Sequence, residues 1–257
     1  MVAGLDTFQK HFAAFSDCYV LIGGTASSLA MEELGAEFRA TKDLDIVLCV
    51  EALHADFGRA FWEFVRAGGY ESRQQSTGER RFYRFQKPTN AGYPFMLELF
   101  SRAPDALVLP PEASLTPIPM DEEVSSLSAI LMNAAYYGLV MGHREKIGDL
   151  SLIKAAALIP LKARAYLDLG NRAAAGEAVD SKNIKKHRND IFRLFTTLTP
   201  GSTIDLTETV KTDMATALTR AEAEMVGLDL NPFGITRMQP GEVIAELRRI
   251  YGLITSI

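Results

Sequence analysis

Two aspartates at alternate positions of a predicted strand constrain the fold more than any other feature of this sequence. They are Asp43 and Asp45 in DLDIVLCV, at the head of an apolar run that predicts a strand. Residues i and i+2 of a strand project to the same face, about 6.6 Å apart along the chain. Since like charges repel, such a pair calls for a compensating cation, and Mg²⁺ suits oxygen ligands of this kind. The alternative is that the first aspartate ends a loop and the second faces solvent on an edge strand.

Two glycines stand at the end of the preceding predicted strand. That strand covers 16–22 (SDCYVLI), and Gly23 and Gly24 follow where the pattern changes from strand to helix. The simplest explanation is a tight turn that needs residues without a Cβ. The alternative is that the bare backbone admits a phosphate chain, to which helix N–H groups and the hydroxyls of Thr25 and Ser27 donate. The glycines alone do not decide between the two.

A third acidic residue, Glu98, occupies the middle of the otherwise apolar segment PFMLELF. Burying a carboxylate without a partner is costly, so we expect it to meet a cation or a hydrogen-bond donor. If its strand lies beside the aspartate strand, Asp43, Asp45 and Glu98 form a three-carboxylate cluster for two Mg²⁺ ions. Such a pair of ions supports phosphoryl transfer, because one activates the attacking oxygen and the other stabilises the leaving pyrophosphate.

Strand and helix patterns alternate in the first half of the chain. One helix is predicted over 25–38, and a second over 52–67 is closed by Gly68 and Gly69. The segments ERRFYRFQ and YPFMLELF flank a connection that contains Pro, Asn and Gly, so we predict an antiparallel pair.

A proline-rich segment, LPPEASLTPIPM over 109–120, is expected to end the β content, because proline lacks a backbone donor and restricts its predecessor. The helices predicted beyond it cover 122–143, 149–169, 181–198, 205–224 and 240–251. The prediction is therefore an α+β protein. A mixed sheet with flanking helices occupies 1–115, and a helical C-terminal domain occupies 120–257.

Composition excludes several other classes. With 257 residues, 47% of them apolar, the chain can bury a full core, and its net charge of −5 argues against a surface that coats DNA non-specifically. Cys18 and Cys49 lie in apolar runs, which predicts buried, reduced thiols and a cytoplasmic protein. The N-terminus shows neither a basic leader nor an apolar signal core, and no apolar run reaches the ~20 residues that span a bilayer. We expect no membrane partner.

The order of Gly-Gly, helix, Asp-x-Asp strand and a later strand with a central Glu resembles the nucleotidyltransferases of the DNA polymerase beta superfamily. IGGTASS and DLDI match the two ends of the family motif, although the 18 residues over 25–42 make a longer spacer than is usual. An extra turn or two of helix and a short loop would absorb the difference. GGTASSLA followed by Arg39, Thr41, Asp43 and Asp45 is similar to the AbiEii/AbiGii group, many members of which are toxins of toxin–antitoxin pairs.

The resemblance implies further site residues in the second half of the chain. Lys162 in LKARAYLDL would bind the triphosphate of an incoming nucleotide, and Asp190 in IKKHRNDIFRLF would orient a base, a lysine or the acceptor group. Arg39 would contact phosphate or anchor the loop before Asp43. The alternatives are a solvated lysine on an amphipathic helix and a weak i,i+4 pair between Asp190 and Lys186.

The function implied is transfer of a nucleotide monophosphate from an NTP to an acceptor hydroxyl, dependent on two Mg²⁺ ions. The resemblance implies an RNA acceptor, the 3′ end of tRNA, and a cognate antitoxin protein as partner. Two alternatives stay open: a small-molecule or protein hydroxyl as acceptor, and a catalytically silent module that binds a nucleotide or a partner. The basic run over 182–188 is either a solvated helix face or a surface that steers a nucleotide or an RNA end.

Overall fold

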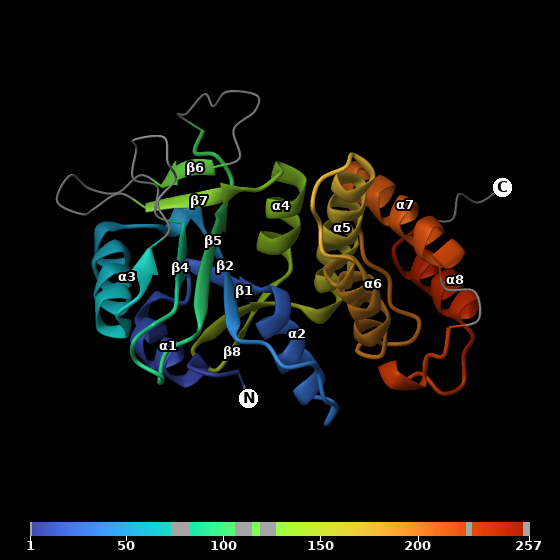
Figure 1. Cartoon of the computed structure of the whole chain (residues 1–257), viewed down its shortest axis with the longest axis horizontal. Coiled ribbons are helices and arrows are strands. Elements are labelled where there is room, and N and C mark those ends of the chain that lie inside the picture. The colour runs from blue at the N-terminus through green and yellow to red at the C-terminus, as the bar shows by residue number, and fades with distance from the viewer. Residues whose placement is uncertain (1, 73–82, 106–114, 119–126, 225–227, 254–257) are drawn as a thin grey trace. The chain divides into compact units, whose positions relative to one another are not determined.

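The computed structural model describes residues 2–72, 83–105, 115–118, 127–224 and 228–253 (Figure 1). The chain folds into two compact units. The first comprises Met1–Glu32 and Arg39–Lys154, and the second comprises Glu33–Phe38 and Ala155–Ile257. Within the described ranges, no helix combines the length and the apolar character needed to cross a bilayer.

A mixed sheet with flanking helices forms the first unit. Its elements in chain order are α1 (Leu5–Phe12), β1 (Tyr19–Ile22), α2 (Gly23–Glu32), β2 (Asp43–Leu48), α3 (Ala55–Gly68), β3 (Glu71–Ser72), β4 (Arg84–Gln86), β5 (Met96–Ser101), β6 (Leu115–Ile118), β7 (Leu127–Leu131), α4 (Ala134–Gly142), β8 (Arg144–Ile147) and β9 (Leu150–Ile153). The strand order is β3-β4-β5-β2-β1-β9-β8, with β7 beside β5 and β6 beside β7. β2 is antiparallel to β1 and parallel to β5. The predicted sheet type and the antiparallel β4–β5 pair are confirmed.

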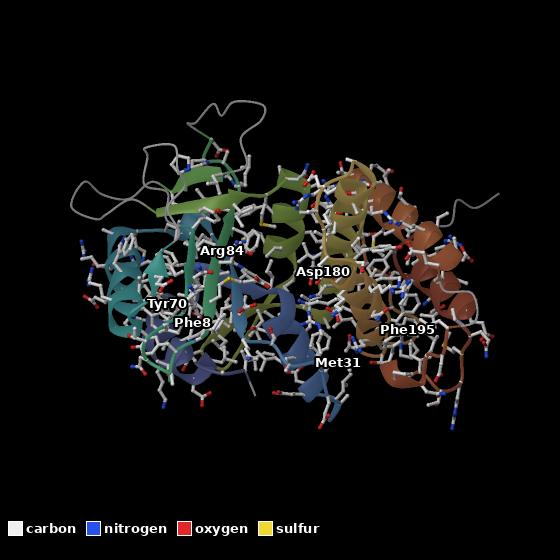
Figure 2. All side chains as sticks on the ribbon, in the orientation of Figure 1. Phe8, Met31, Tyr70, Arg84, Asp180 and Phe195 are labelled. Carbon is white, nitrogen blue, oxygen red and sulfur yellow. The ribbon has the colours of Figure 1, made fainter. Side chains whose placement is uncertain are left out.

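One face of the sheet carries the hydrophobic core beneath α1 and α3. Leu44 of β2 and Phe85 of β4 are fully buried on this face. The ring of Phe61 in α3 lies 5.5 Å from that of Phe85. Phe8 of α1, which is labelled in Figure 2, meets Tyr19 of β1 edge-on at 5.2 Å. Because burying each large apolar side chain contributes about 1.5–3 kcal/mol, this aromatic layer stabilises the packing of α1 and α3 on the sheet.

The opposite face of the sheet is only partly covered. Figure 1 shows α3 and α4 on opposite sides of the central strands, and α2 lies on the same side as α4. Side chains of β4 and β5 that alternate with the core residues are half-buried on this face; they are Arg84, Gln86, Met96, Glu98 and Phe100. Asp43 and Asp45 are half-buried on the same face of β2. The polar residues of the sheet therefore gather on its open face.

The second unit is helical. It contains α5 (Ala155–Ala174), α6 (Ser181–Phe195), α7 (Glu208–Glu224), a short 3₁₀ turn (Asn231–Phe233) and α8 (Pro240–Ile250). α5 continues through Pro160, which is buried within it. The Tyr251 hydroxyl that follows α8 donates to the Ala156 carbonyl oxygen of α5 at 2.7 Å, and this ties the two ends of the unit together. The predicted helical C-terminal region is confirmed.

The β content does not end at the proline-rich segment, so that expectation is wrong. Where a helix was predicted over 122–143, Leu127–Leu131 is strand β7 and only Ala134–Gly142 is helical; 122–126 lies outside the described residues. Pro117 is tolerated in β6 because, among the described strands, β6 pairs only with β7. β8 and β9 follow, and the compact units divide after Lys154, whereas the expected division lay between 115 and 120.

The helix predicted over 25–38 begins earlier and ends earlier than expected. α2 covers Gly23–Glu32, after which a turn leads into irregular backbone up to β2. Gly35 has φ of +67°, a left-handed conformation that interrupts a helix, and Leu34 is exposed in the same turn. The long spacer between the glycines and the aspartates is thus absorbed by irregular chain. The second predicted helix is confirmed as α3, with Gly69 at its C-cap at φ +63°.

Candidate active site

The two glycines are required by close packing at the start of α2. Gly23 has φ of +65°, and a Cβ built on it would lie far inside van der Waals contact of the Asp45 carboxylate. A Cβ on Gly24 would lie 2.5 Å from Oγ1 of Thr41. Ile22, the last residue of β1, is the antiparallel partner of Asp45. The turn therefore needs glycine for two reasons, and it seats the second aspartate against the N-terminus of α2.

Strand register brings Glu98 beside the aspartate pair, as expected. β5 runs parallel to β2, with Asp45 opposite Glu98 and Asp43 opposite Met96. Opposed residues of neighbouring strands share a face, and neighbouring strands lie about 4.8 Å apart. Three carboxylates from two strands thus occupy adjacent positions on the open face of the sheet. Oxygen donors of this kind match the preference of a hard divalent cation, so the donor set fits Mg²⁺ in kind.

Glu98 has a cationic partner on its other side. Nε and Nη2 of Arg84 in β4 both contact Oε1 of Glu98, and the two residues are register partners across the antiparallel β4–β5 pair. In the part of the chain that the structure describes, no group of three His, Cys, Asp or Glu side chains is arranged closely enough to hold a metal ion. The three predicted carboxylates therefore lie on one face of the sheet, and the third of them, Glu98, forms an ion pair with Arg84.

The hydroxyls of Thr25 and Ser27 bind the backbone in this structure. Both residues are fully buried. Oγ1 of Thr25 donates to the Asp43 carbonyl oxygen at 3.0 Å, and Oγ of Ser27 donates to the Gly23 carbonyl oxygen at 2.6 Å. These bonds fasten the first turn of α2 to the head of β2. The two hydroxyls therefore position Asp43 and Gly23, which are themselves candidate site residues.

Arg39 lies in the irregular segment before β2, four residues from Asp43, and is half-buried. The chain between the two residues contains Thr41, whose hydroxyl lies against Gly24. The segment that begins at Arg39 is therefore packed against the start of α2.

Lys162 and Asp190 meet within the helical unit. Nζ of Lys162 in α5 lies 3.4 Å from Oδ2 of Asp190 in α6, and Nη1 of Arg193 lies 3.4 Å from Oδ1. Asp190 is fully buried and Lys162 is 4% exposed, so Lys162 is not a solvated lysine. Removing one member of a buried pair leaves an uncompensated charge, which typically costs about 3–5 kcal/mol. Two residues that the resemblance singled out separately thus form one buried ion pair.

Arg84 is the site residue that sequence reasoning missed. The sequence contained a signal for it. Arg84 alternates with apolar residues in a strand that is predicted to pair with the Glu98 strand, so its side chain lies either on the apolar face or on the face that carries Glu98. Register between the two strands was the missing fact. Only that register distinguishes Arg84 from the neighbouring arginines of ERRFYRFQ.

Comparison with known proteins adds little beyond this geometry. No protein-family model and no curated protein matches the chain. Among solved structures, a protein from H. pylori provisionally described as a nucleotidyltransferase aligns with a TM-score of 0.30 and 15% identity, over 97% of this chain and 91% of that chain. JHP933 from Helicobacter pylori aligns with a TM-score of 0.32 and 14% identity, over 97% and 88% of the two chains. Likeness at this level establishes no shared activity.

Proposed function

We propose that this protein is a divalent-metal-dependent nucleotidyltransferase, which moves a nucleotide monophosphate from an NTP to an acceptor hydroxyl. The observation that carries the proposal is the register of β2 and β5, which sets Asp45 beside Glu98, with Asp43 two residues upstream on the same face. The close packing of the Asp45 carboxylate against Gly23, at the N-terminus of α2, supports the proposal further. Carboxylates beside a helix N-terminus suit a metal-bound triphosphate.

Each candidate residue has a role in this proposal. Asp43, Asp45 and Glu98 would hold two Mg²⁺ ions, which when bound supply charge stabilisation on both sides of the transferred phosphoryl group. Gly23 and Gly24 would leave the backbone of α2 open to the phosphates. Thr25, Ser27 and Arg39 would take part in nucleotide binding, the two hydroxyls by holding the turn in place. For Lys162 and Asp190 the proposed roles are those that the resemblance implies, triphosphate binding and orientation of the lysine, and their buried ion pair supports the second role.

The resemblance to the AbiEii/AbiGii group extends the proposal to the acceptor and the partner. We propose RNA, at the 3′ end of tRNA, as the acceptor, and a toxin role controlled by a cognate antitoxin protein. The solvent-exposed residues Lys182 and Lys185 at the start of α6 are suitable for phosphate contacts. A small-molecule or protein hydroxyl is the competing acceptor, and the assay below includes it.

The test is transfer of label from α-labelled NTPs to total RNA, purified tRNA, a small-molecule fraction of a cell extract or the protein itself, in the presence of Mg²⁺. We expect labelling by the wild type and at least a ~10²-fold lower rate for the Asp43→Ala/Asp45→Ala variant, because the charge stabilisation is lost. Asp17→Ala/Asp56→Ala is the matched control, since it removes two exposed aspartates with the same change in charge. Equal labelling by all three proteins, or none with any acceptor, would refute the proposal.

The second candidate is a catalytically silent nucleotide-binding module. One observation favours it: Arg84 neutralises Glu98, the third acid of the cluster. This candidate predicts a higher melting temperature with NTP and Mg²⁺ and no transfer to any acceptor. Transfer above the level of the double aspartate variant would eliminate it.

A further inference from the structure

A row of side chains crosses four strands on the open face of the sheet. Arg84 of β4 is opposite Glu98 of β5, Glu98 is opposite Asp45 of β2, and Asp45 is opposite Ile22 of β1. Glu98 is therefore the central residue, with a cation on one side and a second carboxylate on the other. Because neighbouring strands are about 4.8 Å apart, both neighbours lie within reach of its carboxylate.

The contact between Arg84 and Glu98 is stronger than an ordinary surface ion pair. Two nitrogens of one guanidinium contact the same oxygen, and the side chains are 27% and 12% exposed. Charge-assisted bonds of this kind are about twice as strong as neutral ones, and partial burial reduces their screening by water. The backbone register brings the two residues together, so the pair does not depend on the chance meeting of two flexible side chains.

A carboxylate paired in this way is a poor ligand for a second cation. Its charge is already compensated, and a divalent ion placed next to it would also meet the positive guanidinium. Like-charge repulsion between Asp45 and Glu98 is relieved by either cation, so arginine and metal satisfy the same need. The two occupy alternative positions on opposite sides of one carboxylate.

We propose that Arg84 competes with the divalent cation for Glu98, so that Glu98 becomes a metal ligand only when the guanidinium releases it. The proposal rests on the function proposed above, because it takes the open face of the sheet as the metal site. Arg84 is accordingly a positioning residue, which acts through Glu98. It sets the metal concentration at which all three carboxylates are engaged.

The experiment measures Mn²⁺ affinity directly, by electron paramagnetic resonance of free Mn²⁺, with no nucleotide and no turnover. We expect Arg84→Gln to bind Mn²⁺ about three- to tenfold more tightly than the wild type, as removal of a partly exposed competing ion pair implies. Arg84→Lys should fall between the two, because lysine keeps the charge and loses the fork. Arg102→Gln is the matched control. Arg102 pairs with Glu51 at 2.8 Å, is 20% exposed and directly follows the other end of β5.

A double-mutant cycle separates competition from general charge repulsion. In the Glu98→Gln background, Arg84→Gln should change Mn²⁺ affinity less than twofold, since the group under competition is gone. Melting curves recorded for each variant show whether it is folded. Unchanged or weaker binding by folded Arg84→Gln overturns the inference, as does an equal gain in the Glu98→Gln background or in the Arg102 control.

The two proposals fail in different ways. If the wild type binds Mn²⁺, Asp43→Ala/Asp45→Ala abolishes that binding and Arg84→Gln leaves it unchanged, the competition is refuted while the proposed site stands. If the double aspartate variant binds like the wild type, the proposed metal site is refuted, and with it the role of Arg84. If only Arg84→Gln binds Mn²⁺, the competition is supported in its strongest form. If neither protein binds Mn²⁺, the competition is refuted.

Discussion

Replacing Gly23 with alanine tests the packing that holds the candidate site together. Alanine at φ +65° costs about 1–2 kcal/mol from the backbone alone. Its Cβ would also lie less than 3.0 Å from the Asp45 carboxylate, so the side chain of Asp45 must move. Overpacking of this kind costs typically about 1–3 kcal/mol. We therefore expect a total destabilisation of about 2–5 kcal/mol, together with a displaced Asp45.

Gly35→Ala is the control, because Gly35 has φ of +67° and a Cβ there would meet nothing within 4 Å. Urea unfolding followed by circular dichroism measures both variants, and we expect Gly35→Ala to lose only the backbone part, about 1–2 kcal/mol. Adding Asp45→Ala should recover part of the loss in Gly23→Ala and none of it in Gly35→Ala. The reasoning is refuted if the two glycine variants lose the same stability, or if Asp45→Ala gives no recovery.

Three further predictions concern other parts of the chain. Lys162→Met should destabilise the protein by about 3 kcal/mol in urea, the lower end of the range for a broken buried pair, because Asp190 keeps Arg193 as a partner. The double variant with Asp190→Asn should be more stable than Lys162→Met, and equal stability of the two would contradict a buried charge pair. Burial raises the pKa of the Cys18 thiol to about 11 and that of Cys49 to about 12, so both should resist a thiol-specific disulfide reagent at pH 8 and react only after denaturation. Since these pKa values exceed those of the unfolded chain, the stability of the protein should fall as the pH rises from about 9 towards about 11–12. Fast labelling of the native protein would show that the thiols are not buried. Tyr251→Phe should cost about 1 kcal/mol in the same unfolding assay, because a main-chain carbonyl of α5 loses its donor, and no loss would mean that water replaces it.

Local pattern was sufficient where one segment carries its own signal. Asp43 and Asp45 share a face because side chains alternate along any strand. The succession of a strand, a helix after the glycines and a strand with the aspartates was predicted from local residue patterns alone. The predicted helix over 52–67 is confirmed as α3, with Gly69 at its cap. These features depend on residues close in sequence, which a pattern can capture.

Pattern was insufficient where a partner distant in sequence decides the structure. Leu150–Ile153 is a short apolar run that fits the start of a helix equally well, and it becomes a strand because it pairs with β1. The helix predicted over 25–38 ends at Glu32, and the following turn contains Gly35 in a left-handed conformation, which glycine permits without requiring, so the residues alone do not predict this end. Propensity is a weak preference that tertiary pairing overrides.

The candidate site shows the same division. By itself the sequence determined which residues are candidates for the site: the glycine pair, the alternating aspartates, the lone Glu98 and, through resemblance, Lys162 and Asp190. Tertiary structure decided which of them meet. Register placed Glu98 between Asp45 and Arg84, and helix packing joined Lys162 to Asp190. The physical reason is that alternation along a strand is a property of the local backbone, whereas the neighbour across a strand or a helix interface depends on how the whole core packs.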